Sequence, residues 1–229
     1  MLDTYCERAG NPGLWAEPFN LFTNLAFVIA ALFAARRFLA MPGLGLRNGW
    51  DLILLIGLLG AIGIGSGLWH SVATRWAVLA DVIPIMLFIN LYLLSFGWRV
   101  LGLGVVGVGL LWGGYQAINY GLLTVVPVDA LNGSVGYLPP LAFLFGFWLV
   151  LRWRRHPMAG SMLGAAGLFA ASLTLRTIDK GVCGLAPIGT HFLWHVLNAV
   201  LLFLLLDGLM RFRGPASAGS RASAVASRS

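Results

Sequence analysis

The chain has 229 residues, of which 59% are hydrophobic and only 10% are charged. Soluble domains carry about 25% charged residues, so this composition excludes an ordinary soluble protein and indicates an integral membrane protein. A net charge of +7 would suit nucleic acid. However, the basic residues stand at the ends of apolar segments and in the tail, which favours membrane topology over a nucleic-acid partner.

The N-terminal segment from Met1 to Glu7 is polar and acidic. It lacks the basic and apolar regions of a cleaved signal peptide, so we expect the first membrane span to be retained.

Seven apolar runs follow, and each is long enough for a span of roughly 20 residues. They cover residues 18–39, 50–71, 76–97, 100–123, 135–154, 158–178 and 189–211. The sequence therefore predicts an all-α integral membrane protein, a seven-transmembrane helix bundle forming one domain over residues 1–213. Residues 214–229 are rich in Ser, Ala and Arg, which is typical of a disordered basic tail.

The distribution of Lys and Arg predicts the orientation of the bundle, because cytoplasmic loops carry the excess of positive charge. With the N-terminus outside, the outer side holds only Arg8, Arg75, Arg176 and Lys180. The inner side holds Arg36, Arg37, Arg47, Arg99, Arg152, Arg154, Arg155, Arg211, Arg213, Arg221 and Arg228. We therefore expect the N-terminus outside and the C-terminus in the cytoplasm.

Two pairs of polar residues have i, i+4 spacing, which places each pair on one face of a helix. Ser66 and His70 end the second predicted span, and His191 and His195 begin the seventh. Asp81 lies early in the third span. In the predicted topology all five fall in the outer half of the membrane.

Three neutral imidazoles can hold a zinc ion with one coordination position left open for water. Ionisable groups inside a membrane are costly, so this cluster is a candidate functional site. A single membrane histidine more often forms an interhelical hydrogen bond, and paired histidines can also hold haem. Haem would not need Ser66 or Asp81.

Smaller features complete the pattern. Glycines in the second span allow close helix approach and suit either a structural bundle or a pocket. Asp179 and Asp207, near helix ends, are expected to pair locally with Lys180 and Arg211. Cys6 and Cys183 are both expected outside, where a disulfide can form if that compartment is oxidising. The alternative is two unpaired thiols.

Several motifs in chain order resemble the alkaline ceramidase family, part of a superfamily of seven-helix zinc hydrolases and receptors. The motifs are Tyr5-Cys6-Glu7, Trp15-Ala16-Glu17-Pro18-Phe19-Asn20 with Thr23-Asn24, Gly65-Ser66 with His70, Asp81-Val82-Ile83-Pro84, and His191-Phe192-Leu193-Trp194-His195. The resemblance covers most of the chain.

The resemblance implies that His70, His191 and His195 bind zinc, with Ser66 and Asp81 around the zinc-bound water. It also implies a disulfide between Cys6 and Cys183.

The family in addition has a calcium site in its acidic N-terminal segment. By resemblance, Glu7 and Glu17 are candidate calcium ligands, and Asp3 and Asn11 are looser candidates. The family has further acidic or amide ligands where this chain has Arg8 and Ala9.

The expected activity is zinc-dependent hydrolysis of the amide C–N bond in a ceramide-like N-acyl lipid, which yields a fatty acid and a long-chain base. Asp81 would transfer protons, and Ser66 would stabilise the oxyanion or orient Asp81. The expected location is a membrane such as the bacterial inner membrane, with zinc in the periplasmic half. The alternative is a zinc-containing lipid or hormone receptor without turnover, although such receptors generally have the inverted topology.

Overall fold

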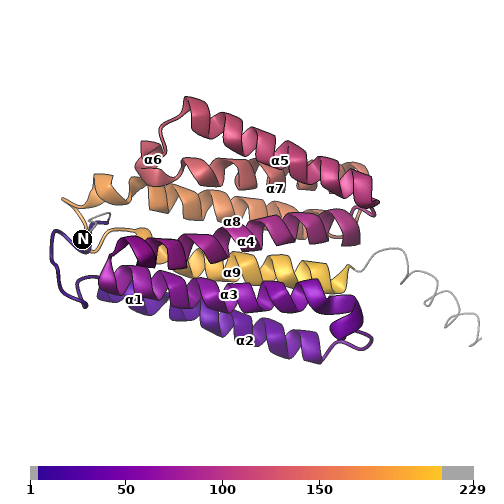
Figure 1. Ribbon diagram of the computed structural model, residues 1–229, viewed down its shortest axis with the longest axis horizontal. Helices are drawn as coiled ribbons and strands as arrows, with labels where there is room; N and C mark the ends of the chain where they lie inside the picture. Colours follow the sequence, from indigo (N-terminus) through magenta and orange to yellow (C-terminus); the bar gives the residue numbers. More distant parts are fainter. Residues whose placement is uncertain (1–4, 213–229) are drawn as a thin grey trace, which may run out of the picture.

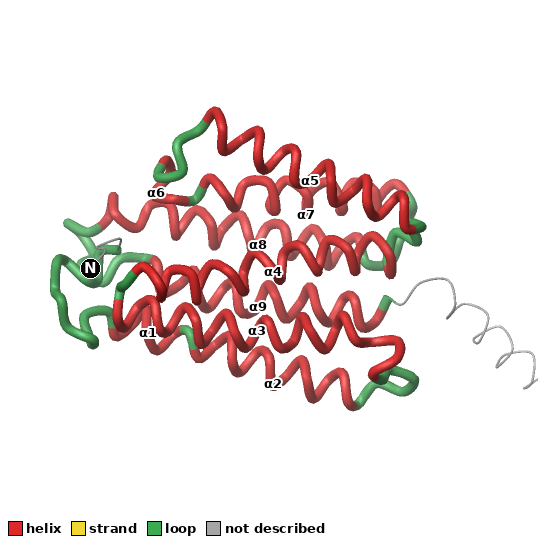
Figure 2. Tube along the Cα trace, in the orientation of Figure 1, coloured by secondary structure: helices red, strands yellow, loops and turns green. Residues whose placement is uncertain are grey.

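The computed structural model describes residues 5–212, and every regular element within that range is a helix. The long helices lie side by side along the longest axis of the molecule, with connections at its two ends (Figures 1 and 2). The α-helices are α1 Pro18–Thr23, α2 Leu25–Leu39, α3 Leu46–Val72, α4 Arg75–Arg99, α5 Val105–Val125, α6 Ala130–Gly133, α7 Leu138–Trp153, α8 Ala159–Ile178 and α9 His191–Arg211. Two 3-10 helices are η1 Val135–Tyr137 and η2 Asp179–Val182. The expected all-α class is confirmed for the described residues, and the expected tail at 214–229 lies outside them.

Six segments are long and apolar enough to cross a membrane. They are Pro18–Leu39, which joins α1 and α2, Leu46–Val72, Arg75–Arg99, Val135–Trp153, Ala159–Val182 and His191–Arg211. Helix α5 is long enough, with 21 residues, but it is not among the six. Gln116 and Asn119 interrupt its otherwise apolar sequence. The structure therefore supports an integral membrane protein with six of the seven expected spans.

Local backbone bonding explains where the observed helices differ from the expected runs. The first run breaks after α1 because the N–H of Asn24 donates to the carbonyl of Leu21 instead of making an α-helical bond. Helix α5 begins at Val105, five residues later than expected, since Gly102 just before it has a left-handed φ of 68°.

Helices α3 and α4 pack closely where each carries a candidate site residue. A Cβ atom on Gly65 would collide with the backbone carbonyl of Ala80. Only glycine permits this approach, which brings Ser66 on α3 towards Asp81 on α4. The structure thus gives one of the second-span glycines a specific packing role next to the candidate site.

The opposite end of the bundle is held by ion pairs. Asp207 bonds to Arg211 at 2.6 Å and to Arg37 at 2.9 Å, which confirms the local pairing expected for Asp207. Arg99 at the end of α4 pairs with Asp51 near the start of α3. These contacts lie at the end of the molecule away from the candidate site.

We predict that Gly65→Ala destabilises the protein by about 1–3 kcal/mol, because the added methyl group has no space against the Ala80 backbone. Gly57→Ala, on the same helix, is the matched control, since its Cβ would meet nothing within 4 Å. Thermal unfolding in detergent would compare the two variants. Equal melting temperatures for both would contradict the packing role of Gly65.

Candidate metal centre

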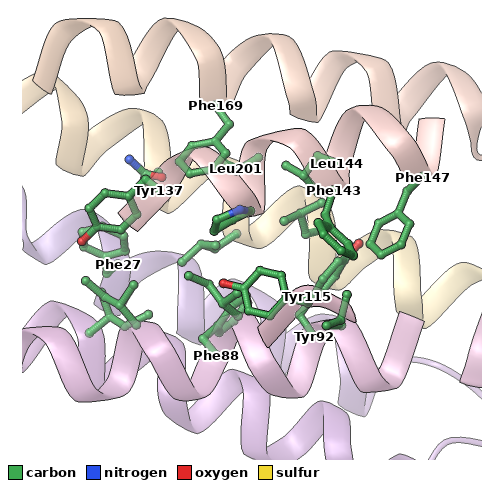
Figure 3. A pocket seen from close by; sticks show the side chains of 18 of the residues that line it. Phe27, Phe88, Tyr92, Tyr115, Tyr137, Phe143, Leu144, Phe147, Phe169 and Leu201 are labelled. Atoms are coloured by element: carbon green, nitrogen blue, oxygen red, sulfur yellow. The ribbon is translucent and has the colours of Figure 1, made fainter. Parts of the chain in front are cut away.

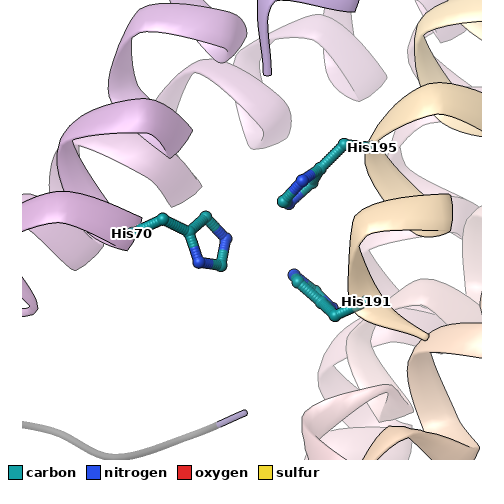
Figure 4. A group of neighbouring side chains, drawn as sticks. All are labelled: His70, His191 and His195. Atoms are coloured by element: carbon teal, nitrogen blue, oxygen red, sulfur yellow. The ribbon is translucent and has the colours of Figure 1, made fainter. Parts of the chain in front are cut away.

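Three histidines from two helices meet at one end of the bundle. His70 lies near the end of α3, and His191 and His195 occupy the first two turns of α9. Their rings point towards a common centre (Figure 4). One nitrogen from each ring lies within 4.8 Å of the others, and all three residues are at most 2% exposed. The convergence expected from the sequence is therefore present.

Two of these rings are oriented by hydrogen bonds to their outer nitrogens. The His70 Nδ1 lies 2.5 Å from the Glu17 Oε2, and the His195 Nδ1 lies 3.0 Å from the Thr23 Oγ1. The Thr23 hydroxyl also donates to the carbonyl of Phe19 at 2.7 Å, which leaves the hydroxyl oxygen to accept from His195. A carboxylate likewise only accepts. Both imidazoles therefore carry their proton on Nδ1 and direct the lone pair of Nε2 towards the centre.

Those inner nitrogens have no protein partner. His70 Nε2 and His195 Nε2 are buried without a hydrogen bond among the described residues, and the ring of His191, whose Nδ1 is also buried and unpartnered, makes none there either. Buried polar atoms are nearly always satisfied, so such a group needs an explanation. A metal ion bound by the three imidazoles would supply it. Three nitrogen ligands, two of them with the outer ring nitrogen held by a carboxylate or a hydroxyl, are typical of catalytic zinc, although imidazole also suits copper, iron and nickel.

Asp179 fixes the start of the helix that carries two of the histidines. Its Oδ1 accepts from the backbone N–H of Thr190 at 2.6 Å and of His191 at 2.9 Å, and its Oδ2 accepts from the N–H of Cys6 at 3.1 Å. A carboxylate at a helix N-terminus satisfies free N–H groups and complements the helix dipole. The expected pairing of Asp179 with Lys180 is wrong, because the carboxylate is used for this cap.

The N-terminal segment covers the histidines. The ring of Tyr5 stacks on His191 with 3.7 Å between ring centroids and lies 5.1 Å from the ring of His70. Burial raises the pKa of Tyr5 above its ordinary value, so its ring stays neutral next to the imidazoles. The Cys6–Cys183 disulfide that the sequence predicted is present, and it anchors this segment to the loop before α9.

Ser66 and Asp81 lie beside the histidines on the wall of a cavity of about 340 Å³. Ser66 is 4% exposed, and its side chain interacts with the Asp81 carboxylate. His191 and His195 line the same cavity. All five residues that the sequence placed in the outer half of the membrane are thus gathered at one site.

A buried arginine holds the carboxylate that orients His70. Arg8 is 1% exposed, and its Nε donates to the Glu17 Oε1 at 2.5 Å. Its other nitrogens donate to backbone carbonyls of His70 at 2.8 Å, Ser71 at 3.3 Å, Asn11 at 3.2 Å and Gly13 at 3.5 Å. Burial by itself would raise the pKa of Glu17. The hydrogen bonds from His70, Arg8 and Asn20 outweigh burial and lower this pKa, which favours the ionised form of Glu17.

The residues proposed for calcium do not form a set of free oxygen ligands. Both Glu17 oxygens are used by Arg8, His70 and Asn20. The Glu7 carboxylate accepts from the N–H groups of Phe19 and Asn20 at the start of α1. The side-chain oxygen of Asn11 accepts from Gly13, and Asp3 lies outside the described residues. The guanidinium of Arg8 supplies a positive charge here, so these residues do not fit a calcium ion.

Several residues of the centre were not identified from the sequence as parts of it. Thr23 belongs to a motif noted above, but its contact with His195 spans 172 positions. Arg8 was noted only because the alkaline ceramidase family has acidic or amide ligands in that part of its N-terminal segment. Tyr5 belongs to the first of those motifs, which gave it no role, and the capping role of Asp179 had no signal beyond its position near Cys183.

No protein-family model matches this chain, and no curated protein is significantly similar to it.

We predict that Glu17→Gln and Thr23→Val each weaken zinc binding about 10- to 100-fold, because each removes a partner that orients a ligand. Competition with a chromogenic chelator would measure the affinity. Asp51→Asn is the matched control, since it also breaks a buried carboxylate–arginine pair but lies far from the histidines. Equal loss of affinity in the control would show a general effect of misfolding and contradict the orienting role.

Proposed function

We propose that this protein is a zinc-dependent intramembrane amidase that hydrolyses a ceramide-like N-acyl lipid to a fatty acid and a long-chain base. One observation carries the proposal. Three histidine nitrogens without protein partners converge beside a cavity that also contains a serine and a carboxylate. The resemblance to alkaline ceramidases supports the choice of an amide substrate.

The proposal includes seven spans, with α5 as the seventh and the N-terminus outside. The distribution of positive charge supports this orientation, because most described basic residues lie at the end of the bundle opposite the histidines. Those at that end are Arg36, Arg37, Arg47, Arg99, Arg152, Arg154, Arg155 and Arg211. Such an excess is typical of the cytoplasmic side. The metal centre and the disulfide would then face an oxidising compartment, such as the periplasm outside a bacterial inner membrane.

Amide hydrolysis needs an activated nucleophile and a polarised carbonyl. His70, His191 and His195 would hold the zinc ion, which would supply both by acting as a Lewis acid and by lowering the pKa of water to about 7. Asp81 accepts the proton of the attacking water and returns it to the leaving nitrogen. Ser66 interacts with Asp81, which favours an orienting role for Ser66 over donation to the oxyanion.

An apolar cavity supports a substrate with an acyl chain. It lies deeper in the bundle and is surrounded mainly by aromatic and aliphatic side chains (Figure 3). Five residues line both this cavity and the one at the histidines, so the two adjoin. They are Phe27, Ile62, Ile85, Tyr137 and Trp194. An acyl chain in the apolar cavity would place its amide near the histidines.

We predict that zinc-loaded protein in detergent releases fatty acid from N-acyl lipids and that Asp81→Asn lowers kcat at least about 100-fold with zinc still bound. Mass spectrometry would follow free fatty acid, and metal analysis would follow zinc. His195→Ala is the metal-deficient control. Near-normal turnover by Asp81→Asn would contradict its proton-transfer role. Stoichiometric zinc without turnover on any lipid would instead favour the receptor-like alternative.

A further inference from the structure

Arg176, near the end of α8, is a buried cation in the wall of the metal-site cavity. It is 8% exposed and lines this cavity together with Asp81, His191 and His195. Its guanidinium carbon lies 5.3 Å from the centroid of the Tyr137 ring and 5.6 Å from that of Trp194. These two aromatic residues also line the apolar cavity. Arg176 therefore lies where the polar and apolar cavities meet.

The protein satisfies only part of this guanidinium. Nη1 donates to the carbonyl of Asn132 at 2.7 Å and to the hydroxyl of Ser134 at 2.8 Å. Within residues 5–212, Nε and Nη2 make no hydrogen bond and no carboxylate forms an ion pair with Arg176. By contrast, Arg8 pairs with Glu17, and Arg99 pairs with Asp51.

Asp81 lines the same cavity and interacts with Arg176 through its charge, but the two make no direct ion pair. A buried cation without a directly bonded anion is costly, and inside a membrane it usually marks a functional site. The contacts of Nη1 explain how Arg176 holds the segment before α7. They do not explain why the position carries a charged group facing the cavity. A guanidinium binds carboxylates with two parallel hydrogen bonds, and Nε and Nη2 form one such pair of donors.

We propose that Arg176 binds a carboxylate on the amine side of the substrate, so that the preferred substrates are N-acyl lipids with an acidic head group, such as N-acyl amino acids. This proposal rests on the proposed function. It keeps the amide hydrolysis and the acyl chain but replaces the long-chain base with an amine that carries a carboxylate. With the acyl chain in the apolar cavity and the amide at the histidines, the head group lies on the polar side of the site, where Arg176 supplies the charge.

The test compares N-oleoylglycine with N-oleoylethanolamine, which share the acyl chain and differ in a carboxylate against a hydroxyl group. We expect the wild type to prefer N-oleoylglycine in kcat/KM. Arg176→Gln should reduce this preference about 10- to 100-fold, mainly through KM, because it removes a charged hydrogen-bonding partner. Arg176→Lys keeps the charge and should retain part of the preference.

Arg154→Gln is the matched control, since it removes one positive charge at the far end of the bundle. It should leave the substrate ratio unchanged. An equal loss on both substrates in Arg176→Gln, or no preference in the wild type, would overturn the proposal. Inhibition by oleate is measured in parallel. If Arg176→Gln relieves that inhibition without changing the substrate ratio, the guanidinium binds the product carboxylate instead, and the proposal is wrong.

A binding measurement separates this proposal from the proposed function. Isothermal titration calorimetry in detergent would compare N-oleoylglycine binding to the wild type and to Arg176→Gln, each checked for zinc content and monodispersity. If the wild type hydrolyses neither lipid but binds N-oleoylglycine at least tenfold more tightly than the variant does, the amidase proposal fails and the carboxylate site stands. Equal affinity in both proteins overturns the carboxylate site whatever the activity.

Discussion

The metal centre depends on a buried chain of hydrogen bonds that runs from Arg8 through Glu17 to His70. A buried ion pair is costly unless its geometry is good and its remaining groups are bonded. Here the arginine also bonds to backbone carbonyls, and the carboxylate also accepts from Asn20. These hydrogen bonds fix the tautomer of His70, so that its inner nitrogen carries a lone pair. Without them, the His70 ring would lose the contact that orients it towards the other two histidines.

The N-terminal segment links the two helices that carry the histidines. Arg8 joins it to the end of α3, and the Cys6–Cys183 disulfide with the Asp179 cap joins it to the start of α9. Helices α3 and α9 are far apart in the sequence but pack against each other and against α2, and these contacts add a further link between His70 and the paired histidines. These hydrogen bonds suit a site in a membrane, where a buried polar group without a partner costs free energy. The proposed metal would bind the inner histidine nitrogens, and the carboxylate of the proposed substrate would pair with the Arg176 guanidinium.

Much of this arrangement could be predicted from the sequence, because membrane spans and i, i+4 pairs are local patterns. The apolar runs predicted the helices to within a few residues, except where Asn24 and Gly102 changed the backbone. His70, His191 and His195 could be brought together only by adding the topology of the bundle. The partners Thr23 and Asp179 could not be predicted, since each depends on a tertiary contact between distant segments. Helix α5 remains a prediction as a span, because its polar residues weaken the apolar signal.

We infer that the three imidazoles form a zinc site with one coordination position open. The most direct measurement is zinc X-ray absorption spectroscopy on the purified wild type, with His195→Ala as the comparison. We expect one zinc per chain with three nitrogen ligands at about 2.0–2.1 Å and one oxygen ligand from water. Correctly folded protein with an intact disulfide that binds no metal, or zinc coordinated without imidazole, would contradict it.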